Sequence, residues 1–139
     1  MDREAFERHL IWAEGFRNKV YTCPAGKLTI GVGRNLEDRG ISDDEVLYLL
    51  RNDIAAAERD AKTLSYYDQL DEVRQLVVCD MVFNLGLTRW LRFTEANKAL
   101  SAHDYERAAD EMVDSKWYTQ TGRRAKRLVE AMRTGKWTW

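Results

Sequence analysis

The sequence predicts a mainly helical α+β fold in two lobes, with a small antiparallel β-hairpin lobe, a long connecting helix and a helical lobe. Three observations predict it. Residues 17–33 alternate in polarity and are interrupted by Gly and Pro, as in a hairpin. A helix-capping signal follows at 42–45. Beyond it, apolar residues recur at helical spacing to the end of the chain, and 45% of the 139 residues are hydrophobic, enough for a core.

The N-terminal segment 3–13 predicts a helix, because Phe6, Leu10 and Ile11 fall on one face. Glu14 continues that apolar stripe, four residues after Leu10. We therefore expect its carboxylate to lie at a helix end, partly removed from water, where the protonated form is favoured.

Residues 17–33 predict a hairpin. Val20 and Tyr21 suit one strand, the segment 23–26 (Cys-Pro-Ala-Gly) suits a turn, and 28–33 suits the returning strand. Alternation places Leu28 and Ile30 on one face of that strand and Thr29 on the other. A short third strand is expected near 35–41.

The rest of the chain predicts helices. Ser42 and Glu45 form a capping box that opens a helix over roughly 43–63. A strongly apolar helix follows at 69–84 and ends at Gly86. Further helices fit 94–101, 104–113 and 122–133, with Thr94 and Asp104 as starts. We expect one domain, 1–139, with a β-containing lobe at about 14–60, a helical lobe at about 1–13 plus 64–139, and a ligand cleft between them.

Charge is unevenly distributed along a chain of net charge −1. Residues 35–72 carry eleven acids and four bases, and residues 115–139 carry seven bases and one acid. The basic end suits nucleic acid, an anionic cell wall or a solvated helix face. Two cysteines are too few for a disulfide scaffold, and His9 and His103 lack partners at metal-site spacing. No apolar run approaches the ~20 residues of a membrane span, and residues 1–4 do not resemble a signal peptide, so we expect synthesis in the cytoplasm.

Three residues could carry chemistry together: Glu14 at the helix end, Cys23 in the turn and Thr29 on the returning strand. A helix end packed on a hairpin can bring them to one point. Glycoside hydrolysis needs an acid that protonates the leaving oxygen and a group opposite that assists water or the cation. Taken singly, the same residues also suit a helix cap, a turn filler and a strand former.

The stretch from Glu14 to Gly33 resembles the active-site hairpin of the phage-type lysozymes, glycoside hydrolase family 24. That family's signature is Glu, eight residues, Asp or Cys, five residues and Thr, which Glu14, Cys23 and Thr29 match in position. The segments 81–86, 115–127 and 133–137 resemble the family's helical lobe, so the resemblance covers most of the chain in the family's order.

The resemblance implies a lysozyme-like fold and a muramidase (endolysin) that cuts the β-1,4 bond between N-acetylmuramic acid and N-acetylglucosamine in phage-driven host lysis. It implies no metal or organic cofactor. The implied catalytic residues are Glu14 as general acid, Cys23 as the group opposite and Thr29 as a placer of water. Arg124 would have a supporting role, because the matching arginine pairs with the catalytic Glu in the family. Phe83 and Asn84, in the cleft wall, would bind the substrate.

The resemblance also sets expectations about partners and location. The partner would be the peptidoglycan glycan strand, met by a monomer that binds no nucleic acid and does not insert stably in a membrane. The protein would be made in the host cytoplasm and act in the periplasm or cell wall, with a separate pore-former for export.

Two departures from the family pattern leave alternatives open. Many members have Asp at position 23, so Cys23 could be a base, a nucleophile or a polar neighbour. The alternative functions are a lytic transglycosylase and a non-catalytic wall-binding module. The family resemblance suggests inversion at the anomeric centre but does not establish it. Position 34 is Arg where members often have His, and we predict an Arg34–Asp53 ion pair.

Overall fold

The computed structural model describes residues 1–138, which divide into two compact units. The first unit comprises Met1–Leu49 and the second begins at Leu50. The boundary falls within one long helix, and each unit is described here by itself.

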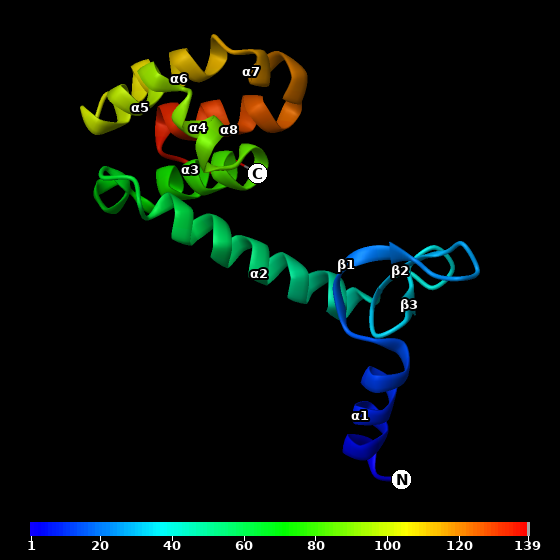
Figure 1. The fold of residues 1–139 in the computed structure, drawn as a ribbon. Helices are drawn as coiled ribbons and strands as arrows, with labels where there is room; N and C mark the ends of the chain where they lie inside the picture. The colour runs from blue at the N-terminus through cyan, green and yellow to red at the C-terminus, as the bar shows by residue number, and fades with distance from the viewer. Residues whose placement is uncertain (139) are drawn as a thin grey trace. The chain divides into compact units, whose positions relative to one another are not determined.

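The N-terminal unit begins with α1 (Arg3–Glu14), followed by β1 (Arg17–Thr22), β2 (Leu28–Gly31) and β3 (Arg34–Asn35). Asp2 caps α1 by accepting a hydrogen bond from the Ala5 N–H at 3.0 Å. The strands form one antiparallel sheet in the order β1-β2-β3 (Figure 1). The predicted helix and hairpin are confirmed, whereas the third strand is only Arg34–Asn35 and overlaps the predicted range near 35–41 at a single residue.

The β1–β2 hairpin is closed by the turn that contains Cys23. The Cys23 N–H donates to the Lys27 carbonyl at 2.9 Å, and the Gly26 N–H donates to the Cys23 carbonyl at 2.8 Å. Tyr21 lies opposite Thr29 in the ladder. Thr29 is only 3% exposed whereas Leu28 is 46% exposed, so β2 turns its polar residue inward and an apolar one outward.

The connecting helix is α2 (Asp43–Ala61), and its predicted capping box is present. Glu45 Oε1 accepts from the Ser42 N–H at 2.9 Å, and the Ser42 hydroxyl accepts from the Glu45 N–H at 3.2 Å. These reciprocal bonds satisfy donors that a helix start leaves open and so fix where α2 begins.

Helices make up the second unit beyond α2 (Figure 1). The predicted helices are found with small shifts at their ends, while the 3₁₀ turn and two short helices, α4 and α7, were not predicted. The elements are η1 (Tyr67–Gln69), α3 (Glu72–Leu85), α4 (Leu87–Leu91), α5 (Thr94–Ser101), α6 (Tyr105–Val113), α7 (Lys116–Thr121) and α8 (Arg123–Thr134).

The hydrophobic core of the described chain lies in this second unit, where α6 packs on α5 and α8, and α8 packs on α3. Trp90 is fully buried in it. The Trp90 indole N–H donates to the Tyr66 hydroxyl at 3.1 Å, that hydroxyl donates to Asn97 Oδ1 at 2.5 Å, and the Asn97 amide donates to the Trp90 carbonyl at 3.0 Å. Burial raises the pKa of Tyr66 to about 12, so the phenol keeps its proton within this ring of bonds.

The α+β prediction is confirmed, since the described residues form a mainly helical chain with one small antiparallel sheet. None of the helices in residues 1–138 has the length and apolar character needed to span a bilayer.

Candidate active site

Glu14 is the last residue of α1, as predicted, but its surroundings differ from the prediction. Its side chain is exposed, so the expected partial removal from water is not found. Within the first unit no hydrogen bond or ion pair engages its carboxylate. Its close neighbour is Gly33 in the turn between β2 and β3, where a Cβ atom would lie 3.1 Å from Glu14 Oε2.

Cys23 and Thr29 are brought together at the hairpin turn. The pKa of the half-buried Cys23 thiol is lowered, chiefly by the Lys27 backbone N–H, with smaller contributions from the Ala25 N–H and the Thr29 hydroxyl, while desolvation opposes the shift. The Thr29 hydroxyl donates its one proton to the Lys27 carbonyl at 2.9 Å, so the backbone N–H groups are the main anion-stabilising donors. The turn therefore makes the thiol at position 23 easier to deprotonate than an ordinary cysteine.

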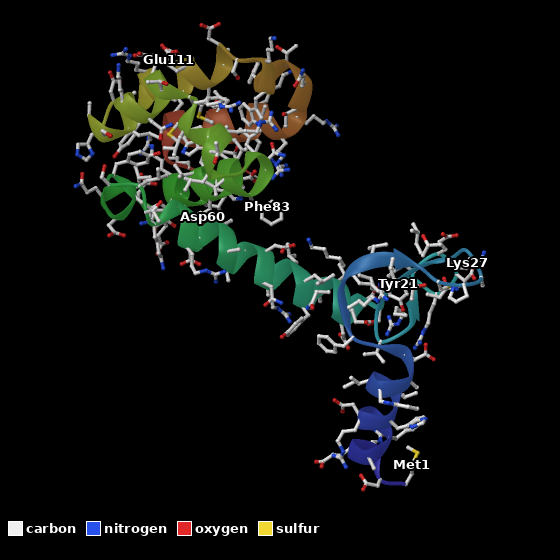
Figure 2. All side chains as sticks on the ribbon, in the orientation of Figure 1. Met1, Tyr21, Lys27, Asp60, Phe83 and Glu111 are labelled. Carbon is white, nitrogen blue, oxygen red and sulfur yellow. The ribbon has the colours of Figure 1, made fainter. Side chains whose placement is uncertain are left out.

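Other charged groups of the sheet are engaged in holding it together. Glu37 accepts from the Leu28 N–H at 2.9 Å, and Asp38 pairs with Lys27 at 3.4 Å. The guanidinium carbon of Arg17 lies 4.5 Å from the centre of the Tyr21 ring, a cation–π contact. Figure 2 places Lys27 at the tip of the hairpin and Tyr21 nearer its base. Glu37 and Asp38 thus have structural partners.

Arg34 pairs with Glu45 within the first unit, whereas the predicted Arg34–Asp53 ion pair would join residues of different units and stays a prediction. Arg34 Nη1 donates to Glu45 Oε1 at 2.8 Å and to the Gly40 carbonyl at 3.2 Å. The Arg34 hydrogen bond, together with bonds from Ser42, lowers the pKa of Glu45 to about 2. The capping box was the sequence signal for this pair, since it turns Glu45 back toward the chain that precedes α2.

Two predicted substrate-binding residues lie at the end of α3 in the second unit. Phe83 is 44% exposed and projects from α3 (Figure 2). It lines an apolar groove of about 360 Å³ with residues of α2, α3 and α8: Leu50, Ile54, Ala57, Leu76, Cys79, Asp80 and Arg124. Asn84 Oδ1 accepts from the Trp117 indole N–H at 3.0 Å, which commits its carbonyl oxygen to the helical bundle.

Arg124, the predicted supporting residue, is paired with Asp80 in the same unit. Its Nε and Nη2 atoms lie 2.9 and 2.5 Å from Asp80 Oδ1. The expected pairing of Arg124 with Glu14 joins groups of different units and stays a prediction. Sequence analysis missed Asp80 as the partner, since 44 residues separate it from Arg124.

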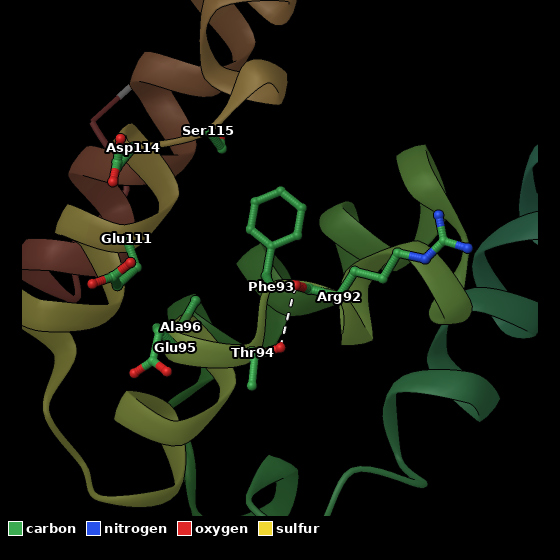
Figure 3. A pocket seen from close by; sticks show the side chains of 8 residues that line it. All are labelled: Arg92, Phe93, Thr94, Glu95, Ala96, Glu111, Asp114 and Ser115. Carbon is green, nitrogen blue, oxygen red and sulfur yellow. Dashed lines mark hydrogen bonds between the residues drawn. The ribbon is translucent and has the colours of Figure 1, made fainter.

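A separate pocket of about 300 Å³ in the second unit contains none of the catalytic, supporting or substrate-binding residues predicted from the sequence (Figure 3). Phe93 forms one wall, and Glu111 and Asp114, from α6 and its C-terminal end, face it across the opening. Glu95 also lines it but is paired with Lys98 and Arg107. Across residues 1–138, no group of three or more His, Cys, Asp or Glu side chains is arranged to hold a metal ion.

Comparison with known proteins gives one consistent family. A family model described as phage lysozyme matches residues 12–134. The chain is 31% identical to "Probable T4-type lysozyme 1" of Dictyostelium discoideum, over 91% of this chain and 92% of that protein. It is 33% identical to an endolysin of Acyrthosiphon pisum secondary endosymbiont phage 1, over 75% and 70% respectively. It is also 28% identical to the pre-baseplate central spike protein Gp5 of Enterobacteria phage T4, over 88% of this chain but only 26% of that protein.

Proposed function

Because the chain belongs to the phage lysozyme family, and is thus a glycoside hydrolase of the lysozyme type, we propose that its β-hairpin and the end of α1 carry the catalytic groups. The bond cut is the β-1,4 link between N-acetylmuramic acid and N-acetylglucosamine in peptidoglycan. The observation that carries the proposal is the family match over residues 12–134, which includes Glu14, Cys23 and Thr29 in the family's spacing.

Glu14 acts as the general acid that protonates the leaving glycosidic oxygen. Its exposure lets a sugar reach the carboxyl group, and no side chain of the first unit competes for that group. A positioned acid of this kind accelerates such reactions by about 10²–10⁴-fold.

Cys23 and Thr29 act on the water that attacks the sugar. The Lys27 and Ala25 N–H groups stabilise a thiolate, which can take a proton from that water as a base. Because the Thr29 hydroxyl proton is used on the Lys27 carbonyl, the Thr29 oxygen can serve the water only as a hydrogen-bond acceptor.

The remaining parts of the proposal concern substrate contacts and location. Phe83 and Asn84 form part of the cleft wall, and Arg124 supports the acid. The protein acts as a monomer on the glycan strand, is made in the host cytoplasm and reaches the wall through a separate pore-former. It binds no nucleic acid. One relative named as an endolysin supports the lysis role.

The test is turbidity loss of purified peptidoglycan together with release of reducing sugar. Glu14→Gln should lose at least about 100-fold in rate, because the amide cannot donate the catalytic proton in the same way. Glu7→Gln is the matched control, since Glu7 lies on the same helix, is exposed and should keep full activity. Full activity in Glu14→Gln would refute the proposal.

Product analysis separates hydrolysis from transglycosylation on the same scaffold. Wild type, Cys23→Asp and Cys23→Ser should all give reducing ends by mass spectrometry, with Cys23→Ser slowest because serine is a far weaker base. Anhydro-muramic ends would instead assign a lytic transglycosylase, and binding to the wall without any product would assign a non-catalytic module.

A further inference from the structure

We infer that Gly33 positions the carboxylate of Glu14. A side chain at position 33 would displace that carboxylate from the place in which it acts as an acid. The inference rests on the proposed role of Glu14 as general acid. Gly33 belongs neither to the family signature matched above nor to the helix that carries the acid. Its contact with Glu14 joins two segments that are 19 residues apart in the sequence.

The contact runs along the outer half of the acid. A Cβ atom built on Gly33 would lie 3.1 Å from Glu14 Oε2, 3.3 Å from Cδ and 3.4 Å from Cγ. Three consecutive atoms of the Glu14 side chain therefore rest against the open face of the glycine. An added methyl group would overlap the carboxyl carbon and oxygen, which would have to shift by a few tenths of an ångström.

The backbone at Gly33 is held in place because the strands on both sides of its turn, β2 and β3, pair with each other. Ile30 of β2 pairs with Arg34 of β3, so residues 31–33 form a tight connection between partnered positions. Gly33 has φ +71°, a backbone conformation that side chains rarely adopt. The same ladder pairs Thr29 with Asn35. The turn that contains Gly33 and contacts Glu14 is therefore held by the same sheet that carries Thr29.

The contact with Gly33 is the close approach that the structure gives the Glu14 carboxylate. Within the first unit that carboxylate makes no hydrogen bond or ion pair, so no polar partner there competes with Gly33 in setting its position. A general acid must lie within about 2.6–3.2 Å of the oxygen that it protonates. Small displacements of such groups cost large factors in rate, on the order of 10²-fold for 1 Å.

Gly31 provides a matched control for Gly33. Its φ is also +71°, so alanine suffers the same backbone penalty there, but a Cβ atom at Gly31 would meet nothing within 4 Å. Gly33→Ala and Gly31→Ala should lower the melting temperature by similar amounts. Only Gly33→Ala should lower kcat, by about tenfold or more relative to Gly31→Ala, with KM little changed, because the lost interaction acts in the transition state.

A double-mutant cycle distinguishes positioning from a general structural effect. In a Glu14→Gln background, Gly33→Ala should cause no further loss of the residual activity, because the group that it displaces no longer acts. If Gly33→Ala proves too unstable to assay, Gly33→Asn and Gly31→Asn replace the pair, since Asn tolerates positive φ and still carries a Cβ.

The inference is overturned if the two alanine variants have equal kcat, if Gly33→Ala changes only KM, or if it costs the same factor with and without Glu14. Failure of the proposed function is a different result, because it requires only that Glu14→Gln be fully active, whatever the residue at position 33.

Discussion

The two thiols of the chain lie in opposite environments. Backbone N–H groups, led by that of Lys27, lower the pKa of Cys23, whereas burial, as the main cause, raises the pKa of Cys79. Cys79 lies on α3, where its sulfur is 3.3 Å from the Tyr67 hydroxyl. Since the thiolate is the reactive form, the folded protein should be alkylated by iodoacetamide at Cys23 well before Cys79 between pH 7 and 8.5.

Mass spectrometry of timed samples measures this order, with Cys23→Ser and Cys79→Ala assigning each signal. In denaturant both thiols lose their surroundings, and their rates should converge toward that of an ordinary cysteine. Faster native alkylation of Cys79 would contradict the assignment of Cys23 as the activated thiol.

At the scale of the elements, the start of α2 is acid-sensitive. The pKa of Glu45 falls from about 4.5 to about 2 on folding, so its contribution to stability is complete above pH 4.5 and disappears as pH drops toward 2. Glu45→Gln keeps a capping side chain but loses the charge. Urea midpoints should therefore show a wild-type advantage over Glu45→Gln that is largest at neutral pH and shrinks to nothing near pH 2.

Asp53→Asn serves as the control on the same helix. Because Arg34 is paired with Glu45, removing the charge at position 53 should leave the pH dependence of unfolding unchanged. If Asp53→Asn weakened the pH dependence of unfolding while Glu45→Gln did not, the Arg34–Asp53 ion pair predicted from the sequence would be favoured over Arg34–Glu45.

At the scale of the whole molecule, burial is strongly uneven. In the described chain every buried apolar side chain lies at Ala57 or beyond, and Thr29 is the buried residue of the first unit. Local opening free energy follows buried apolar contact. Hydrogen exchange should therefore be slowest in α3, α6 and α8 and fastest in α1 and the sheet, by more than about tenfold. Uniform protection along the chain would contradict this.

Removing core volume should act on the second unit first. Leu128 is almost completely buried on α8, so Leu128→Ala should cost about 2–5 kcal/mol of unfolding free energy. In the Leu128→Ala variant, protection of backbone amides against hydrogen exchange should fall in α3, α6 and α8 together.

What the sequence predicts well is what local chemistry determines. The capping box at Ser42 and Glu45 located the start of α2, and Asp104 caps α6 as expected by accepting from the Arg107 N–H at 3.2 Å. The helix α5 was found with its predicted ends. Short helices such as α4 and α7 span fewer than two turns, too few for apolar periodicity to show.

What the sequence could not predict depends on approach in space. The family resemblance suggested Asp53 as the partner of Arg34. The geometry of the capping box would have suggested Glu45. The contact of Gly33 with Glu14 requires knowing how the β2–β3 turn meets α1. Thr29 is buried while its neighbour Leu28 is exposed, which is opposite to the usual arrangement in which the apolar residues of a strand face inward.

The ring of bonds among Tyr66, Trp90 and Asn97 constrains how this protein can diverge. The Tyr66 hydroxyl links the other two side chains, because it accepts from the Trp90 indole N–H and donates to Asn97 Oδ1, so replacing Tyr66 alone strands the buried indole N–H. The Asn97 amide donates to the main-chain carbonyl of Trp90, which does not depend on the side chain at position 90. Lineages that alter one of these positions should alter the others with it, exchanging the set for a purely aliphatic filling. Correlated substitutions at positions 66, 90 and 97 among related sequences would then reflect these hydrogen bonds.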